Sequence, residues 1–480
     1  MKIERHRTAM SRRAVSRPVG LAMADEILSE GTTFFDYGCG RGFDVQFLVD
    51  AGIDATGWDP AFAPSMPKTP ADVVNIGYVV NVIEDPTERV DAIKSAWSLA
   101  AGVLVVAGRL TAEGRQSGFV PFADGELTNR GTFQKFYEQH ELRDWIGATL
   151  GSEPVAAAPG VFYVFRDEVA RETFVASRFR PTRSAPRVRV SDRLYDEHRE
   201  LLEQVADFFS QRGRLPADGE VPYTVDVKEA LGGWRKAFRV LLTVTGGDQW
   251  TELASARADD LTVYIALSKF GRRSAWSKLD PSLQRDVRAH FGSYKRACEV
   301  GDELLFSAGV MENIDRAIKQ ADVGKRTPNA LYIHRSALGT LPPVLRVYEG
   351  CGRVLVGAVD EANMIKLSRD QPKVSYLSYP DFDTNPHPAL ARTVVTYPGD
   401  LRVLSREYQP TSNRPILHRK EEMVAGDYPL RQKFERLTRQ EERAGLYKHP
   451  ATIGFEQGWS EALEECGVSL RGHRVIQQRP

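Results

Sequence analysis

The sequence has few cysteines, no net charge and no long apolar run. Its four cysteines, Cys39, Cys298, Cys351 and Cys466, are far apart and form no C-x-x-C pair, which argues against a zinc ribbon or a disulfide framework. No stretch approaches the roughly 18 apolar residues of a membrane-spanning helix. The first residues are charged where an export signal would be apolar. We therefore expect a cytoplasmic protein without a membrane partner.

The charge balance excludes a global electrostatic attraction to nucleic acid. Lys plus Arg and Asp plus Glu are equal at 64 each, so any nucleic-acid surface must be a local patch. The 480 residues, of which 42% are hydrophobic, are enough for several domains of about 150 residues. Composition alone names neither a partner nor an oligomeric state.

The first third of the chain has the pattern of an α/β fold, because short apolar runs alternate with amphipathic segments. This pattern predicts a parallel sheet covered by helices. The expected strands are Thr33–Tyr37, Ala55–Trp58, Val73–Gly77, Val103–Ala107 and Gly160–Phe165. The expected helices are Asp44–Ala51, Pro86–Leu99 and Thr132–Leu150.

Changes of pattern along the chain predict three domains. The first covers residues 1–175, and the arginine-rich stretch Ser177–Val190 that follows has the composition of an exposed linker. Residues 191–320 have helical spacing and no convincing strand, so we expect a helical domain there. Residues 322–480 combine strand-like runs, as in LYIHRSALGTLPPVLRVYEGCGRVLVGAV, with a charged helix, which predicts a mixed α/β domain.

A glycine-rich turn after the first predicted strand is the strongest functional signal. Asp36, Gly38, Gly40 and Gly42 follow an apolar strand in FFDYGCGRG, where glycines let the backbone approach a bound cofactor closely. The spacing differs from the G-x-G-x-x-G of dinucleotide-binding folds, which makes NAD or FAD the weaker hypothesis. Asp59 ends the next strand in GWDP. Each feature alone could be a tight turn or a cap, but their order on alternating strands predicts a cofactor site.

A third signal lies in residues 71–86, ADVVNIGYVVNVIEDP, at the end of the next predicted strand. Its Asn75-Ile76-Gly77-Tyr78 faintly resembles the N-P-P-Y of amino-group methyltransferases, in which the polar side chain accepts a hydrogen bond from the target amine. Both prolines are missing. Asn75 and Tyr78 are therefore candidate catalytic residues, and the alternative is that Asn75 caps the strand while Tyr78 packs on the sheet.

The N-terminal segment is basic, with Arg5, His6 and four further arginines ahead of the first strand. Such a segment could close over a pocket and position a phosphate or another anionic acceptor. The alternative is a solvated charged face. The candidate substrate or nucleic-acid contacts are Arg7, Arg12, Arg13 and Arg17.

These motifs resemble those of class I S-adenosylmethionine-dependent methyltransferases. The resemblance implies a Rossmann-like first domain and S-adenosylmethionine as the cofactor, with Asp59 accepting hydrogen bonds from both ribose hydroxyls. The cofactor-binding residues that it implies are Asp36, Gly38, Cys39, Gly40, Gly42, Asp59, Pro60 and Asn75. One departure is Val82, which stands where many family members have a histidine, so a mechanism that uses that imidazole as a base is not expected here.

More specifically, the chain resembles the DNA phosphorothioation-associated methyltransferase family. The matching phrases run from RHRTAMSRRAVSRPVGLA, FDYGCGRGFDV, NIGYVVNVIEDP and APGVFYVFRDE to SYPDFDTNPHPAL and PILHRKEEM, and cover essentially the whole chain. The resemblance implies a bacterial DNA-modification context, with nucleic acid and phosphorothioation-system proteins as partners. It does not identify the methyl acceptor.

Three functional hypotheses follow. The first is a methyltransferase that acts on nucleic acid or a nucleic-acid-derived substrate. The second is a cofactor-binding or DNA-binding accessory protein without catalysis, and the third is a methyltransferase for a small molecule or peptide. We expect no metal, because Asp381, Asp383 and His387 in SYPDFDTNPHPAL match no fixed ligand spacing and are typical of turns.

Overall fold

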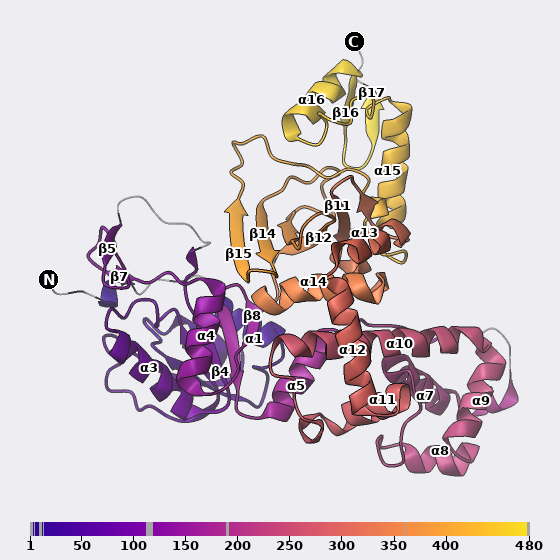
Figure 1. The fold of residues 1–480 in the computed structure, drawn as a ribbon, viewed down its shortest axis with the longest axis horizontal. Helices are drawn as coiled ribbons and strands as arrows, with labels where there is room; N and C mark the ends of the chain where they lie inside the picture. The colour runs from indigo at the N-terminus through magenta and orange to yellow at the C-terminus, as the bar shows by residue number, and fades with distance from the viewer. Residues whose placement is uncertain are drawn as a thin grey trace. The chain divides into compact units, whose positions relative to one another are not determined.

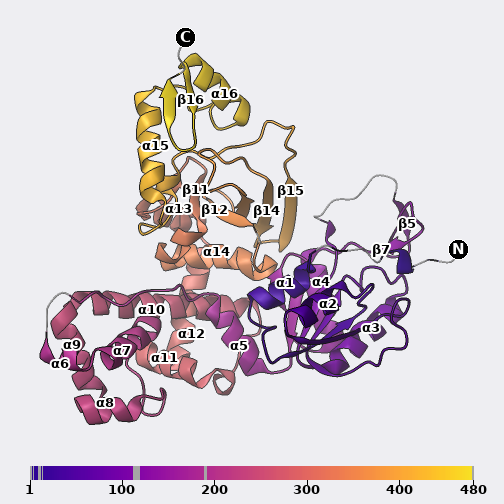
Figure 2. The same ribbon diagram turned by 180° about the vertical axis from the view of Figure 1, so that it is seen from behind.

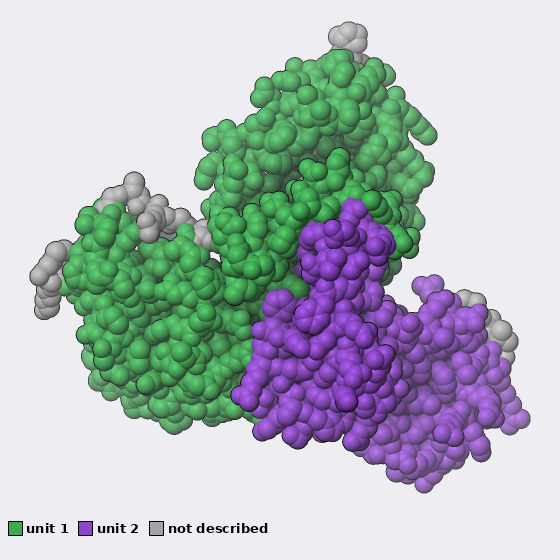
Figure 3. All heavy atoms as spheres, in the orientation of Figure 1, with its two compact units in different colours: residues 1–167, 318–340, 349–480 green, residues 168–317, 341–348 purple. Residues whose placement is uncertain are grey.

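A computed structural model describes residues 3, 5–8, 12, 14–111, 119–188, 192–359 and 361–477. The chain divides into two compact units, coloured in Figure 3. Unit 1 comprises residues 1–167, 318–340 and 349–480, and unit 2 comprises residues 168–317 and 341–348. The three predicted domains remain a prediction, since this division places residues near both ends of the chain in one unit.

The N-terminal part of unit 1 contains a six-stranded sheet of order β2-β1-β3-β4-β9-β8. Strands β1 to β4 pair in parallel, whereas β9 runs antiparallel to both of its neighbours. This is a mixed α/β, Rossmann-like sheet. Its strands are β1 Thr33–Tyr37, β2 Asp54–Trp58, β3 Ala71–Gly77, β4 Ala100–Ala107, β8 Val155–Ala158 and β9 Val161–Phe165.

Helices cover this sheet because successive strand residues point to opposite faces. On one face Phe35, Val74 and Leu104 pack with Ile93 of α3 and Ile146 of α4 in one apolar cluster. Figures 1 and 2 show these helices from opposite sides. The helices are α1 Arg17–Ala24, α2 Phe43–Asp50, α3 Pro86–Leu99 and α4 Gln139–Leu150, with the short helix η1 at Arg5–Thr8. A small antiparallel sheet comprises β5 Val120–Phe122, β6 Gly125–Leu127 and β7 Phe133–Gln134.

The five predicted strands are confirmed to within a few residues, but β8 was not predicted. The helix predicted from Thr132 was wrong at its start, because it begins at Gln139. Residues ahead of it are extended, and Glu138 and Glu141 form a capping box that fixes the helix start. The aromatic rings of Phe133 and Tyr137 are fully buried in this extended segment, so their apolar spacing imitated a helix.

The C-terminal part of unit 1 is built on a second six-stranded sheet, antiparallel throughout and ordered from β10 to β15. Its strands are β10 Lys325–Arg326, β11 Ala330–His334, β12 Ala362–Ser368, β13 Val374–Ser378, β14 Arg392–Tyr397 and β15 Arg402–Glu407. The predicted charged helix is α15 Arg431–Arg443. The remaining elements are η5 Arg335–Thr340, η6 Lys420–Glu422, α16 Glu456–Glu465, β16 Val468–Leu470 and β17 Val475–Gln477.

One strand-like run of this region is a helix, which corrects the sequence analysis. Helix α14 covers Pro343–Val356. Its buried residues Leu345, Tyr348 and Leu355 follow helical rather than alternating spacing. The β-branched residues of this run had favoured a strand. They are also compatible with a buried helix face, because packing there depends on apolar side-chain volume more than on helix propensity.

All described elements of residues 192–317 are helices. They form a core around stacked Phe209 and Phe238, with Trp250 edge-on to both rings. In unit 2 and at its borders the elements are α5 Glu168–Ser177, α6 Arg193–Glu197, α7 Arg199–Arg212, α8 Thr224–Leu231, α9 Trp234–Thr245, α10 Asp248–Leu267, η3 Ser268–Phe270, η4 Trp276–Lys278, α11 Pro281–Phe291, α12 Tyr294–Ala308 and α13 Met311–Gln320. Across the described residues, no helix combines the length and apolar character needed to cross a membrane.

The predicted exposed linker is partly buried instead. Phe179 is 6% exposed, and Arg180 and Arg183 form ion pairs with the buried carboxylates of Asp286 and Asp260. Arg180 and Arg183 therefore belong to the packing of unit 2. The arginine and proline content of this stretch had indicated solvent exposure, because arginines are rarely buried unless they are paired. Here Arg180 and Arg183 are paired.

Gly301 of α12 gives a test of the packing between α10 and α12. Alanine normally stabilises a helix interior by about 1 kcal/mol over glycine. A Cβ at Gly301 would lie 2.8 Å from Ile265 Cγ2 and 3.1 Å from the backbone nitrogen of Ala266. We therefore expect Gly301→Ala to lower the free energy of unfolding by about 1–3 kcal/mol, the range for overpacked cores, in a denaturant titration.

Gly309 is the matched control, because the nearest atom to its Cβ would be the Phe306 carbonyl oxygen at 3.4 Å. Gly309→Ala should be close to neutral. A stabilised Gly301→Ala protein would show that the two helices are not packed this closely.

Candidate functional site

The predicted site residues gather around one pocket at the carboxyl ends of β1, β2 and β3. The cavity has a volume of about 810 Å³. Among the predicted residues its wall contains Arg12, Arg17, Asp36, Gly38, Cys39, Gly40, Asp59, Pro60, Asn75 and Tyr78. Gly42 and Arg7 are not part of this wall, and Arg13 lies outside the described residues.

The turn after β1 uses three glycines in left-handed backbone conformations. The φ angles are 91° at Gly38, 53° at Gly40 and 77° at Gly42. The backbone nitrogens of Gly38 and Cys39 both donate to the carbonyl oxygen of Trp58, at 2.7 and 3.1 Å. These hydrogen bonds hold the turn against the end of β2. Glycine is required here because the backbone is left-handed and lies close to the pocket.

Asp59 at the end of β2 holds this turn in place. Its Oδ2 accepts a hydrogen bond from the Gly40 backbone nitrogen at 3.0 Å. Its Oδ1 accepts from the backbone nitrogens of Ala61 and Phe62, at 2.8 and 3.0 Å. Since a carboxylate offers about four acceptor positions, Asp59 retains capacity for a ligand toward the pocket. Asp59 therefore caps backbone N–H groups, as the alternative hypothesis expected, and still has acceptor positions that are not used by the chain.

Asp36 and Asn75 form a buried pair on the adjacent strands β1 and β3. They lie opposite each other in the strand register, and Asn75 Nδ2 donates to Asp36 Oδ1 at 2.8 Å. Burial raises the pKa of the Asp36 carboxyl to about 7, against the lowering effect of the Asn75 hydrogen bond. Asn75 Oδ1 is buried without a hydrogen-bond partner in the described chain. Both side chains belong to the pocket wall, and Asp36 and Asn75 are only 4% and 3% exposed.

Cys39 contributes its backbone to the turn rather than a reactive thiol. Burial, with the charges of Asp36 and Asp59, raises the pKa of the Cys39 thiol to about 12. The thiol therefore stays protonated at neutral pH and is a poor nucleophile.

Tyr78 lies directly after β3 with a φ of 61°, a left-handed conformation that is rare for an aromatic residue. Its backbone nitrogen donates to the Ala107 carbonyl oxygen at 2.8 Å, which ties the turn to the end of β4. Strain of this kind is concentrated at functional sites. No sequence pattern had indicated this conformation.

The N-terminal segment forms part of the pocket wall, but its arginines have different roles. Arg5 donates to Glu84 at 2.7 Å and to both oxygens of Glu88, so its charge is neutralised within unit 1. Arg17 donates to the Pro159 carbonyl oxygen at 2.8 Å. Arg7 is exposed. Arg12 lines the pocket and interacts electrostatically with Asp36.

The pocket also contains residues that the sequence analysis missed. Asp44 of α2 accepts from the Ser16 backbone nitrogen at 2.8 Å, and Asn81 donates to Gln134 at 2.9 Å. Arg109 follows β4 and lines the same cavity. Only Asp44, two residues after the glycine turn, had a sequence signal that could have found it.

In the described residues, no three His, Cys, Asp or Glu side chains gather as a metal site. His387 instead contacts Glu441 at 2.6 Å and the Leu417 carbonyl oxygen at 2.9 Å. Asp383 accepts a hydrogen bond from the Tyr428 hydroxyl. His387 and Asp383 are therefore engaged in contacts within the C-terminal part of unit 1.

No protein-family model matches the chain, and no curated protein matches it. Several solved structures match about a third of the chain at low similarity. The 1,6-didemethyltoxoflavin-N1-methyltransferase of Burkholderia thailandensis shares 14% identity over 31% of this chain and 76% of its own, with a TM-score of 0.25. A sugar N-methyltransferase from Streptoalloteichus shares 15% identity over 31% of this chain and 84% of its own, with a TM-score of 0.25. The magnesium protoporphyrin IX methyltransferase of Synechocystis shares 16% identity over 34% of this chain and 93% of its own, with a TM-score of 0.24.

Substitutions at Gly38 and Gly42 distinguish two reasons why the turn contains glycine. One is the left-handed backbone, and the other is the lack of space for a Cβ. A Cβ at Gly38 would lie 2.4 Å from Val79 Cγ2, whereas one at Gly42 would have no atom within 4 Å. Gly42→Ala should therefore cost only the left-handed backbone, about 1–2 kcal/mol. Gly38→Ala should lower the free energy of unfolding by more than that. Denaturant titrations of both proteins measure the difference, and equal losses would exclude a close contact with Val79.

The raised pKa of Asp36 predicts a pH dependence of stability. Because the pKa rises from 3.8 to about 7 on folding, the folded chain keeps a proton that the unfolded chain releases. The contribution of Asp36 to stability is therefore full below about pH 4 and is lost as the pH rises to about 7. Asp36→Asn should gain stability relative to the wild type across this window, measured by denaturant titrations at each pH. A difference that does not vary with pH would contradict the shift.

Proposed function

We propose that the chain binds S-adenosylmethionine in this pocket and transfers its methyl group. The observation that carries the proposal is the convergence of the left-handed glycine turn, Asp36 and Asp59 on one cavity at the carboxyl ends of adjacent parallel strands. Ligands of open α/β sheets bind at this edge. The low-similarity matches contribute nothing to this proposal.

The residues of the pocket fit a cofactor that carries positively charged groups. S-adenosylmethionine carries a sulfonium and an ammonium group, and when bound it supplies an electrophilic methyl carbon. Asp36 is a buried carboxylate and Asn75 Oδ1 a buried acceptor without a partner in the described residues. A cation near them would compensate the desolvation of both groups. Asp59 would accept hydrogen bonds from ribose hydroxyls through its remaining acceptor positions.

The chain's own contribution to methyl transfer is alignment and exclusion of water, since a displacement at a methyl carbon needs few chemical groups. Asn75 and Tyr78 are the proposed catalytic residues, because they lie at the end of β3 beside the pocket floor. Neither Val82 nor the protonated Cys39 thiol can serve as a base there.

For the acceptor, we propose nucleic acid or a nucleic-acid-derived substrate, in a context linked to DNA modification and phosphorothioation. Arg12, Arg17 and Arg109 line the cavity, and their guanidinium groups suit a phosphate-bearing acceptor. Phosphorothioation-system proteins are the proposed partners, on the resemblance of the sequence alone.

A second candidate is a small-molecule methyltransferase. The observation that favours it is the cavity volume of about 810 Å³, which lies within the usual range of roughly 300–1,000 Å³ for small-molecule sites. The N-terminal segment contributes Ile3, Arg5 and Thr8 to the wall of this cavity.

Transfer of a labelled methyl group tests the proposal. The full chain is incubated with labelled cofactor and with duplex DNA, single-stranded DNA, RNA, nucleotides or uncharged small molecules, and the labelled product is compared with that of Asn75→Ala. We expect label on at least one phosphate-bearing acceptor and its loss in the variant. Label only on uncharged small molecules favours the second candidate. Cofactor binding without transfer to any acceptor contradicts catalysis.

Asp59→Asn should weaken binding of S-adenosylhomocysteine by about 1.5–3 kcal/mol, the range for hydrogen bonds to a charged group. Asparagine keeps one oxygen for the Ala61 and Phe62 backbone, but its amide nitrogen cannot accept the Gly40 N–H, so part of the loss comes from the glycine turn. Asp54→Asn at the exposed start of β2 is the matched control and should bind like the wild type. Calorimetric titration measures all three proteins.

The same titration with a cofactor analogue that lacks the ribose hydroxyls isolates the role of Asp59. Removal of the ribose hydroxyls should weaken binding by the wild type more than binding by Asp59→Asn. A variant that still discriminates the analogue as the wild type does would disprove the ribose contact.

A further inference from the structure

Unit 2 contains two copies of one three-helix module. The first copy is α7, α8 and α9, and the second is α10, α11 and α12 (Figure 1). In each copy the second helix is followed by a glycine in a left-handed conformation, Gly232 with a φ of 73° and Gly292 with a φ of 74°. The third helix begins two residues after that glycine, at Trp234 or Tyr294. The chain therefore repeats the same turn between the same pair of helices.

The sequence around this turn is duplicated without a gap. Residues 226–240 read DVKEALGGWRKAFRV, and residues 286–300 read DVRAHFGSYKRACEV. The alanine in the first turn of the third helix, Ala237 or Ala297, is buried in both copies. Each of the first seven residues of this helix is buried, half-buried or exposed alike in the two copies.

The aromatic residue that begins the third helix also packs alike in both copies. The ring centroids of Trp234 and Tyr223 lie 6.0 Å apart, and those of Tyr294 and Trp276 lie 5.6 Å apart. Tyr223 directly precedes α8, and Trp276 lies in η4 ahead of α11. The aromatic partner therefore comes from the same part of each module, so the packing is duplicated along with the sequence.

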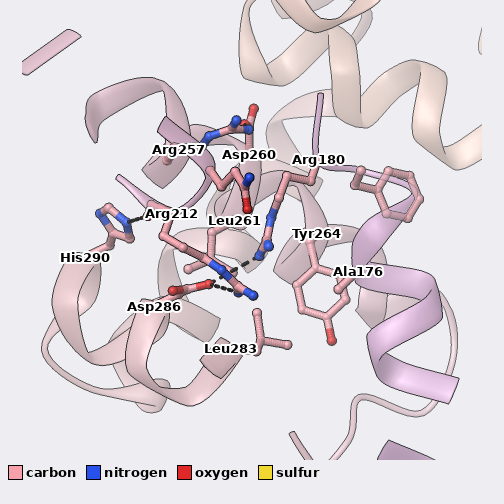
Figure 4. A pocket seen from close by; sticks show the side chains of 12 residues that line it. Ala176, Arg180, Arg212, Arg257, Asp260, Leu261, Tyr264, Leu283, Asp286 and His290 are labelled. Atoms are coloured by element: carbon pink, nitrogen blue, oxygen red, sulfur yellow. Dashed lines mark hydrogen bonds and ion pairs between the residues drawn. The ribbon is translucent and has the colours of Figure 1, made fainter. Parts of the chain in front are cut away.

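One difference between the copies joins them to each other. Asp226 is exposed in the first copy, whereas Asp286, at the same position of the second, is buried. Asp286 accepts hydrogen bonds from Arg212, the last residue of α7, at 2.9 Å and from Arg214 at 2.7 Å. Figure 4 shows Arg212 reaching Asp286. These contacts hold the second helix of one module against the end of the first helix of the other, within unit 2.

Three positions of the duplicated segment carry a basic residue in both copies, and lysine and arginine are exchanged at each of them. The pairs are Lys228 and Arg288 on the second helix, and Arg235 and Lys295, and Lys236 and Arg296, on the third. All six side chains are exposed. Lysine and arginine differ in shape and in hydrogen-bond geometry. The property that the two copies share at these positions is therefore positive charge.

The chain leaves most of this charge on the third helices without a partner. In the part of the chain that the structure describes, no carboxylate forms an ion pair with Arg235, Lys236 or Lys295. Arg296 pairs with Glu299 at 3.3 Å, and both side chains are about half exposed. Such exposed pairs contribute little. Helix α9 contains three basic residues and no acidic one.

We propose that unit 2 binds the phosphate backbone of duplex DNA through these repeated basic positions. A surface that repeats the same cationic groups suits a polymer that repeats the same anionic group, and each nucleotide of a duplex carries one phosphate. Helix-turn-helix proteins dock on duplex DNA with the start of the helix that follows the turn, which is where both copies present their basic pair. Contacts to phosphates carry no sequence information, so the binding is independent of base sequence. This surface shares no residue with the pocket of unit 1 and does not depend on methyl transfer.

Binding of the full chain to duplex DNA over a range of salt concentrations tests the proposal. The wild type is compared with two double variants, Arg235→Gln with Lys236→Gln and Lys295→Gln with Arg296→Gln. Each phosphate contact contributes about −0.9 to the slope of log affinity against log salt. We expect each double variant to bind more weakly and to make this slope shallower by about one to two. The losses should be the same for two duplexes of unrelated sequence.

The matched control is Arg193→Gln with Arg199→Gln, which removes two exposed charges of unit 2 outside the duplicated segment. This variant should bind duplex DNA with the wild-type slope. An equal change of slope in the control would overturn the proposal, because net charge alone would then explain the binding. A slope that neither double variant changes also overturns it. So does a wild type that binds no duplex at low salt, or that binds vesicles of anionic lipid but no duplex, whether or not the variants fold.

Discussion

The hydrogen bond between Asn75 and Asp36 is the contact on which the pocket of unit 1 depends. It joins the carboxyl ends of β1 and β3 at the point where the glycine turn leaves the sheet. A carboxylate buried this deeply is unfavourable, and burial raises the pKa of the Asp36 carboxyl to about 7. The hydrogen bond orients Asp36, and Asn75 Oδ1 is buried without a hydrogen-bond partner in the described residues.

The sheet and the candidate pocket of unit 1 could be predicted because both depend on local patterns. Apolar strands followed by glycines and an acidic residue are visible in sequence, and so were Asp36, Gly38 and Asp59. The left-handed backbone of Tyr78 could not be predicted, since tertiary contacts rather than residue type impose it. The short strand β8 and the start of α4 also depended on packing and capping that periodicity does not reveal.

The charge of unit 2 shows a different limit of sequence reasoning. A chain of zero net charge holds a concentrated group of arginines, because residues such as Arg180, Arg257 and Arg346 come together only on folding. The overall composition does not reveal such a cluster, because it counts charges without regard to their positions in the fold. By contrast, Arg273 of the middle region forms an ion pair with Asp302.

A crystal structure of the full chain with S-adenosylhomocysteine tests the central claim most directly. The account predicts that the cofactor lies in the pocket of unit 1, with its ribose at Asp59, its amino group near Asp36 and Asn75, and its sulfur facing Tyr78. An empty pocket at saturating cofactor, or a cofactor bound elsewhere on the chain, would contradict the account.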